Sequence, residues 1–462
     1  MIGIVNKVKS SRMRCFAACV LFAYLLSVPS VMAVAPHELL VLANRNEPVS
    51  VRIAQAYIQR RQIPRQNLVL LDLAASADYV SMSRASFTRE VWMPAQRAIS
   101  QRRLDHILAW VFSTHIPFRV DHNPPVSLQG LVFVRNELPG DNAIVRAEYV
   151  SPLFAGPAAP QGQVRASHSF AFAAEGLGSQ MPIPSMTLGY IGTRGNSEEQ
   201  ILQIIERGKS ADGTSPRGVV YFVTQDDIRS RVREWQYGPV AETLRSFRRE
   251  AVVTNALPQG AAAVIGIMMG AADVDLSGIG SFVPGAMGEH LTSFGATFDQ
   301  AGQTKVTRWV DAGVTGTAGT VTEPLAIWAK FPHARFYVHY LSGCTLIESY
   351  YLSVRTPLQT MFLGDPLVAP WAVAASLRIA GIAEGEVVTD PRSIDLHIQA
   401  PFGTQYGRVV YLLNGQIAGE GTSFVLDPAS LPPGLHELRA VAYRAGFIQS
   451  PVFDVVRFRI TP

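Results

Sequence analysis

The residues best placed for chemistry follow short apolar runs that have the composition of buried strands. His115 follows the run Asp105–Ser113. In an open parallel sheet, ligands bind beyond the carboxyl ends of the strands. Imidazole titrates near neutral pH, so His115 is a candidate general base. The alternative is a histidine that caps the strand end and bonds the backbone.

Five carboxylates follow other predicted strands: Asp226, Asp227, Asp273, Asp275 and Glu323. We take His115, Asp226 and Glu323 as the candidate catalytic residues. Carboxylate oxygens also suit a hard divalent cation, although the same residues are ordinary in turns and helix caps. Neither an EF-hand loop nor an HExxH spacing is present, and we predict no metal site and no cofactor.

A second group of polar residues consists of candidates for ligand binding: Asn44, Asn46, Asp273, His290 and Ser293. Asn44 and Asn46 follow the first predicted strand. Ser293 lacks the GxSxG pattern of a nucleophile elbow. His290 lies close to it in a predicted helix, Pro284–Phe294, where neighbours rarely form a nucleophile–base pair.

Three further motifs have structural explanations beside functional ones. Cys344 precedes a helix, whose N-terminus lowers the pKa of a thiol. Thr345 and Glu348 form a capping box that explains the same segment, and we favour that reading. The glycines of Gly313–Gly319 lack the Lys-Ser/Thr of a P-loop. The stretch Asp227–Trp235 mixes arginines with a tryptophan, and it could bind an acidic ligand or form a solvated helix face.

The elements that must position these residues form a predicted α/β domain over residues 34–371. Leu39–Ala43, Pro48–Gln62 and Asn67–Asp72 form a strand–helix–strand unit whose short return makes the strands parallel. The further predicted strands are Asp105–Ser113, Gly130–Arg135, Gly218–Thr224, Ala262–Met268 and a segment ending in Gly319–Thr322. The further predicted helices are Phe87–Ser100, Glu198–Gly208, Tyr237–Ala251, Pro284–Phe294 and Thr345–Ser353. This alternation predicts a three-layer, mostly parallel sheet, caspase-like or flavodoxin-like. Pro152–Gln180 is predicted to form a long surface loop.

Residues 375–462 have a different pattern, with short alternating strands between turn signals. The predicted strands are Ser376–Ile379, Ser393–Gln399, Arg408–Leu413, Ser423–Leu426, Glu437–Tyr443 and Val452–Ile460. Asn414-Gly415 is a strong hairpin signal. The spacing predicts a small immunoglobulin-like sandwich that serves as a spacer or stabiliser.

The first 33 residues have the pattern of a cleaved signal peptide. Four basic residues precede the apolar run Cys15–Leu26, Pro29 breaks the run, and Val31-Met-Ala33 supplies a cleavage site. The run is shorter than the roughly 20 apolar residues of a membrane span. We therefore expect an exported protein, periplasmic or extracellular, without a transmembrane segment after cleavage. Without the leader, 36 basic residues face 36 acidic ones, which gives no argument for a nucleic-acid partner.

Four blocks of the chain resemble an uncharacterised family of exported bacterial proteins: His290–Ala296, Gly316–Pro324, Gly343–Tyr351 and Gly364–Leu367. The likeness covers roughly Glu38 to Pro370, and it implies a shared fold without an assigned activity. A weaker likeness is to the gingipain group of caspase-like cysteine peptidases, which carry a His after one core strand and a Cys after the next. The matching segments, Ile267–Ala272 and Phe282–Met287, hold neither residue. The resemblance therefore implies that the dyad is absent.

Two hypotheses follow. In the first, the protein is non-catalytic and binds a protein partner or a small molecule. In the second, it is an exported hydrolase, peptidase-like or metal-assisted, that uses His115 with strand-end carboxylates. The missing dyad and the structural explanation of Cys344 favour the first. Convergence of His115 with Asp226, Asp273 or Glu323 in one crevice would favour the second.

Overall fold

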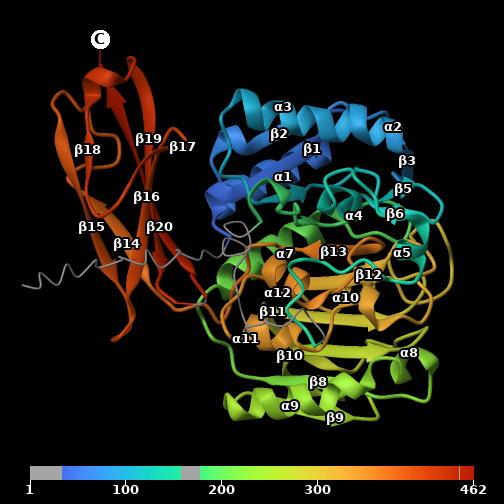
Figure 1. Ribbon diagram of the computed structural model, residues 1–462. Helices are drawn as coiled ribbons and strands as arrows, with labels where there is room; N and C mark the ends of the chain where they lie inside the picture. Colours follow the sequence, from blue (N-terminus) through green and yellow to red (C-terminus); the bar gives the residue numbers. More distant parts are fainter. Residues whose placement is uncertain (1–33, 77, 158–176, 447, 462) are drawn as a thin grey trace, which may run out of the picture.

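The computed structural model describes residues 34–76, 78–157, 177–446 and 448–461. The predicted signal peptide, and residues 158–176 of the predicted surface loop, lie outside the described residues. An α/β part holds a ten-stranded sheet, and two smaller antiparallel sheets follow it in the chain (Figure 1). Among the described helices, none has the length and apolar character needed to cross a bilayer.

The large sheet has the order β2-β1-β4-β7-β13-β12-β11-β10-β8-β9. Its strands are β1 Leu39–Asn44, β2 Leu68–Leu71, β4 Ala109–Phe112, β7 Ser185–Thr187, β8 Val219–Val223, β9 Glu250–Thr254, β10 Ala261–Gly270, β11 Gly280–Leu291, β12 Gly316–Thr320 and β13 Thr360–Gly364. The neighbours from β2 to β7 are parallel, as are those from β12 to β9, whereas β13 runs antiparallel to β12. Arg119, beyond the end of β4, donates to the carbonyl of Val321, beyond the end of β12, at 3.3 Å. Arg194, beyond β7, likewise donates to the carbonyl of Phe298, beyond β11, at 2.9 Å. Both parallel groups therefore end at one edge, although β13 also meets β7 in a single parallel pairing, Leu363 with Thr187. The predicted mostly parallel sheet is confirmed.

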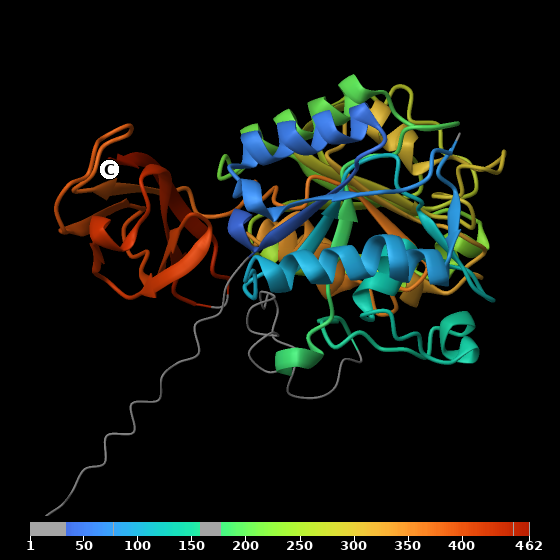
Figure 2. The ribbon, with the colours of Figure 1, turned by 90° about the horizontal axis from the view of Figure 1, so that it is seen from above.

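Helices cover both faces of this sheet. Figure 2 shows α1 (Pro48–Arg61) and α7 (Glu198–Ala211) on one face and α3 (Met93–Gln101) on the other. Strand β1 shows why both faces need covering, because its successive apolar side chains point to opposite faces of the sheet. Val41 packs in one buried cluster with Ile53 of α1, and Leu42 packs in another with Ala95 of α3. Burial of each such aliphatic side chain contributes about 1.5–3 kcal/mol.

The remaining elements of this part are short. The helices are α2 Arg84–Ser86, α4 Leu128–Phe133, α5 Asp141–Val145, α8 Ile228–Arg231, α9 Tyr237–Ser246, α10 Val306–Asp311, α11 Phe336–Leu341 and α12 Leu346–Ser353, with a π-helical turn, Phe87–Trp92, before α3. A small sheet joins β3 Ser81–Ser83, β5 Arg119–Asp121 and β6 Val126–Ser127.

Three element predictions were wrong. Gly130–Arg135, predicted as a strand, belongs mainly to helix α4, which Ser127 caps by accepting the N–H of Gly130 at 2.8 Å. Every residue of α4 is buried, so its sequence carries no helical periodicity. The helix predicted to reach Ala251 ends at Ser246, and β9 begins at Glu250.

The third wrong prediction concerns Pro284–Phe294, which forms most of strand β11 rather than a helix. The strand pairs with β10 over much of its length and with β12 at Met287. A side chain at Gly288 would come within 2.3 Å of Trp309, so the small residue lets the helix α10 pack directly on the strand. Contacts with segments distant in sequence therefore override the local helical pattern.

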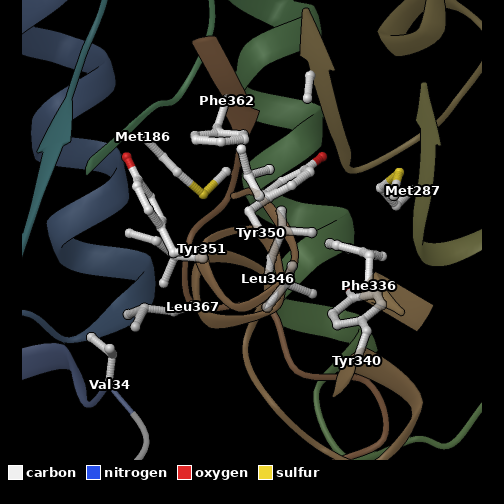
Figure 3. Close-up of a cluster of buried hydrophobic side chains, with 14 of the residues drawn as sticks. Val34, Met186, Met287, Phe336, Tyr340, Leu346, Tyr350, Tyr351, Phe362 and Leu367 are labelled. Carbon is white, nitrogen blue, oxygen red and sulfur yellow. The ribbon is translucent and has the colours of Figure 1, made fainter. Parts of the chain in front are cut away.

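The centre of the core brings α12 against β13. Tyr350 stacks on Phe362 with ring centroids 4.8 Å apart, and Tyr351 donates to the carbonyl of Ser185 at 2.8 Å. Figure 3 shows these rings with Val34 and Leu367 at the margin of the same cluster. The core thus extends to the start of the described chain.

The C-terminal part is a β-sandwich. Its strands are β14 Ser376–Ala380, β15 Arg392–Gln399, β16 Tyr406–Leu413, β17 Gln416–Glu420, β18 Phe424–Leu426, β19 Gly434–Arg444 and β20 Pro451–Ile460. All six predicted strands are present, and β17 is an addition. Asn414 and Gly415, with φ of 53° and 78°, make the two-residue turn between β16 and β17.

The sandwich packs on the edge of the large sheet where the strands begin (Figure 1). Tyr443 of β19 lies 3.4 Å from His37 Nε2 and 3.4 Å from Glu38 Oε1, just before β1. Ala35 is buried in a cluster with Val410 and other apolar residues of the sandwich. The opposite edge, where the parallel strands end, holds Asn44 and His115.

Candidate functional site

Three of the predicted site residues meet at the ends of β1 and β4. Asn44 Nδ2 donates to the carbonyl of His115 at 3.0 Å, and the N–H of Asn46 donates to Asn44 Oδ1 at 3.1 Å. Thr114 Oγ1 lies 3.0 Å from His115 Nδ1. Asn44 and Asn46, predicted to bind ligand, are thus neighbours of His115, predicted to be catalytic.

Sequence reasoning missed two residues of this cluster, Glu47 and Tyr79. The rings of Tyr79 and His115 meet edge to face, 5.5 Å apart, and the Tyr79 hydroxyl donates to Glu47 Oε1 at 2.6 Å. Both aromatic residues have left-handed backbones, with φ of 43° and 56°, a strain that often occurs at functional sites. Tyr79 comes from an irregular segment, so no periodic signal in the sequence could have found it.

The surroundings of His115 act on its charge in opposite directions. Partial burial lowers the pKa of His115, while Glu47 and Glu198 oppose that shift. The cavity beside the ring, lined by Phe118, Tyr190 and others, has a volume of only about 20 Å³, room for about one water. The cluster therefore has the groups of a base but no ready-formed substrate pocket.

The candidate catalytic residues do not come together. The end of β12, which precedes Glu323, is three strands away from that of β4, and the end of β8, which precedes Asp226, is six strands away. At a spacing of about 4.8 Å per strand, these separations are roughly 14 and 29 Å. Asp226 pairs with Arg231 at 2.8 Å, and Glu323 accepts the N–H of Leu325 at 2.7 Å. Among the described residues, His115, Asp226 and Glu323 therefore do not share a crevice, as the hydrolase hypothesis requires.

His290, predicted to bind ligand, is instead buried in β11. Its Nδ1 accepts the indole N–H of Trp309 at 2.9 Å, so Nε2 carries the proton and donates to the carbonyl of Thr304 at 3.1 Å. Burial lowers the pKa of His290 to about 4. Ser293 follows the same strand, where its carbonyl accepts the hydroxyl of Thr320. Asp273 is exposed beyond β10. His290 therefore has a structural role.

Two other features bear on chemistry. Cys344 is fully buried, which raises the pKa of its thiol, and Thr345 with Glu348 forms the predicted capping box. In the part of the chain that the structure describes, no three His, Cys, Asp or Glu side chains are grouped so that they could hold a metal ion.

A pocket of about 400 Å³ lies between the α/β part and the sandwich. Ligand pockets typically have 300–1,000 Å³ and often occur at domain interfaces. Much of the wall is apolar: Val34, Leu367, Ala369, Ala374, Leu377, Val452 and Phe453. These residues come from segments far apart in sequence. The sequence marks the place only as a change of composition after Pro370.

Charged residues form one corner of this pocket. Arg61 of α1 is 4% exposed and is bonded to Asp365, at 2.7 Å through Nε, and to Asp212. Lys209 of α7 lies 3.5 Å from Asp212, and its side chain is 39% exposed. Because Asp212 is already held by Arg61, Lys209 is the cation that remains available to a ligand.

Glu38, which is buried where the sandwich meets the start of β1, should make the stability of the protein depend on pH. Its Oε2 accepts the N–H of Ala35 at 2.7 Å, and burial raises the pKa of Glu38 from 4.5 to about 8. A raised folded-state pKa stabilises the fold at low pH, and this contribution is lost as pH rises from 4.5 through 8. Glu38→Gln should therefore become more stable relative to the wild type as pH rises from 5 to 9, as measured by urea unfolding.

The control for this prediction is Glu242→Gln, at an exposed position of α9. Its stability relative to the wild type should be nearly constant over the same range. An equally flat difference for Glu38→Gln would contradict the prediction.

The comparisons with known proteins add little to this geometry. No protein-family model matches the chain, and no curated protein matches it significantly. Among solved structures, the chain is similar to fibronectin(III)-like modules of CbhA from Clostridium thermocellum, with 14% identity, 23% of this chain and 54% of that chain covered, and a TM-score of 0.17. The chain is also similar to an endo-beta-1,4-mannanase from Thermotoga petrophila, with 10% identity and a TM-score of 0.16. That match covers 57% of this chain and 49% of the mannanase chain. A third similar structure is the spore cortex lytic enzyme SleM of Clostridium perfringens, with 10% identity and a TM-score of 0.16. That match covers 76% of this chain and 90% of the SleM chain. The chain thus spans about half the length of the first two proteins, and similarity this low supports no conclusion about function.

Proposed function

We propose that the protein is an exported, non-catalytic binding protein that holds a small, mainly apolar molecule with one acidic group. The observation that carries this proposal is the pocket of about 400 Å³ between the α/β part and the sandwich. Its aliphatic and aromatic wall suits an apolar body, and Lys209 at its charged corner suits an anionic end. The leader pattern of the sequence supports export.

The dispersed catalytic candidates support a non-catalytic role. We also propose that the large sheet is caspase-like and the sandwich immunoglobulin-like. In the matching region, β10 is followed by Ala271-Ala272 and β11 by Thr292-Ser293. The segment Phe282–Met287 lies within β11 rather than after it, but the residues that do follow the strand include no cysteine either.

The fluorescent probe 1-anilinonaphthalene-8-sulfonate, an apolar ring system with one anionic group, tests this proposal. Titration of the purified protein should give a saturable rise in fluorescence. Ala374→Trp, which adds a bulky ring at the lining of the pocket, should weaken binding of the probe at least about tenfold. Lys209→Met should weaken it about three- to tenfold, because the anionic group loses its cation.

The matched control is Ala429→Trp, at an exposed alanine of the sandwich outside the pocket. This variant should bind the probe as the wild type does. A rise that does not saturate, or one that Ala374→Trp leaves unchanged, would show that the probe binds elsewhere and would overturn the proposal.

A further inference from the structure

Two tryptophans and a histidine form an aromatic patch at the edge of the large sheet where the parallel strands end. The patch consists of Trp235, which follows α8, and of Trp328 and His333, which follow β12. The ring centroids of Trp235 lie 5.5 Å from Trp328 and 5.4 Å from His333, and those of Trp328 and His333 are 5.9 Å apart. Trp235 is 48% exposed. Its indole N–H donates to the carbonyl of Val232 at 3.1 Å, which holds the ring in place.

His333 forms the buried base of this patch. The residue is only 2% exposed, and its Nδ1 accepts the backbone N–H of Arg335 at 3.0 Å. The proton therefore lies on Nε2. Burial is the main cause that lowers the pKa of His333 to about 3, so the ring is neutral. Among the described residues, Nε2 has no hydrogen-bond partner. A buried donor of this kind is unfavourable until it meets an acceptor.

The charges around the patch differ in how they are paired. Arg229, Arg231 and Arg233 each form an ion pair, with Asp227, Asp226 and Glu289. Arg335 is partly buried, which lowers its pKa, and its Nε is also without a partner in the described part of the chain. No described carboxylate pairs with it. The patch therefore combines ring faces with the guanidinium of Arg335, while His333 Nε2 and Arg335 Nε are buried donors without a partner among the described residues. Glu234, next to Trp235, also forms no ion pair within the described part of the chain.

We propose that the aromatic patch binds an acidic saccharide, namely a pyranose ring that carries a carboxylate. The apolar C–H face of the sugar would stack on the exposed ring of Trp235, and the carboxylate would pair with Arg335, which is only partly buried. A neutral sugar would leave Arg335 without a counter-charge. This site is separate from the interdomain pocket, and the proposal does not depend on the function proposed for that pocket.

Intrinsic tryptophan fluorescence of the purified protein tests the proposal. Titration with tri-galacturonate should give a saturable change, whereas cellotriose, a neutral trisaccharide of the same length, should bind at least about tenfold more weakly. Trp235→Ala should weaken tri-galacturonate at least about tenfold, while Trp235→Phe should keep most of the affinity. Arg335→Gln should remove the preference for the acidic sugar.

Because Trp235 is itself a reporter, calorimetric titration of each variant accompanies the fluorescence. Phe247→Ala, at an aromatic residue that is 53% exposed elsewhere, is the matched control and should bind as the wild type does. Absence of saturable binding would overturn the proposal. So would equal affinity for the two trisaccharides, or an unchanged affinity in folded Trp235→Ala.

Discussion

Asp365→Asn should lower the free energy of unfolding by about 3–5 kcal/mol, because it leaves Arg61 buried without its main counter-charge. Asp365 is completely buried. Its Oδ2 accepts from Arg61 Nε at 2.7 Å, and its Oδ1 accepts from the Tyr57 hydroxyl at 3.0 Å. The same oxygen accepts the N–H of Leu367 at 3.1 Å. One carboxylate thus ties the end of β13 to α1.

Urea unfolding of the purified protein at pH 7 measures this loss. The matched control is Glu198→Gln, which breaks the exposed pair between Arg52 and Glu198, whose side chains are 55% and 31% exposed. Exposed pairs contribute about 0–1 kcal/mol, so the control should stay within that range. A loss below about 1 kcal/mol in Asp365→Asn would mean that Arg61 finds another partner, and would contradict the prediction.

The parts of the fold that the sequence predicted are those in which local signals agree with tertiary packing. The first strand alternates between the two faces, and Pro48 begins α1 where the pattern places it. Helix α12 begins at its capping box. In the sandwich, the Asn414-Gly415 turn marked the end of β16, and the alternation of buried and exposed residues in β14 indicated a strand. These signals lie within a few residues of the elements that they define.

The wrong predictions depend on partners that the local sequence does not contain. The small residues and Pro284 of β11 resemble a helix start, and only the pairing with β10 and the approach of Trp309 decide for a strand. The same limit applies to the candidate site. Asn44 ends β1 and His115 follows β4, the adjacent strand, but the order that separates β4 from β8 and β12 cannot be inferred from short apolar runs.

Arg233 and Glu289 form a second buried pair, and the two possible single variants should respond differently to pH. Arg233 Nη2 lies 2.5 Å from Glu289 Oε1, and neither side chain is more than 1% exposed. Arg233 also donates to the carbonyls of Met269, at 3.0 Å, and Pro332, at 2.6 Å. Burial raises the pKa of Glu289, which Arg233 opposes. Without the arginine, the carboxyl group can therefore become neutral by taking up a proton.

Arg233→Met should consequently lose about 3–5 kcal/mol at pH 8 and clearly less at pH 5, where proton uptake by Glu289 relieves the buried charge. Glu289→Leu should lose a similar amount at both pH values, because the guanidinium of Arg233 stays protonated throughout this range. Urea unfolding of both variants at the two pH values measures the difference. The double variant Arg233→Met/Glu289→Leu should show no such pH dependence relative to the wild type. Equal losses at both pH values in Arg233→Met would mean that Glu289 stays ionised without its partner, and that water reaches a carboxylate which the described structure completely encloses.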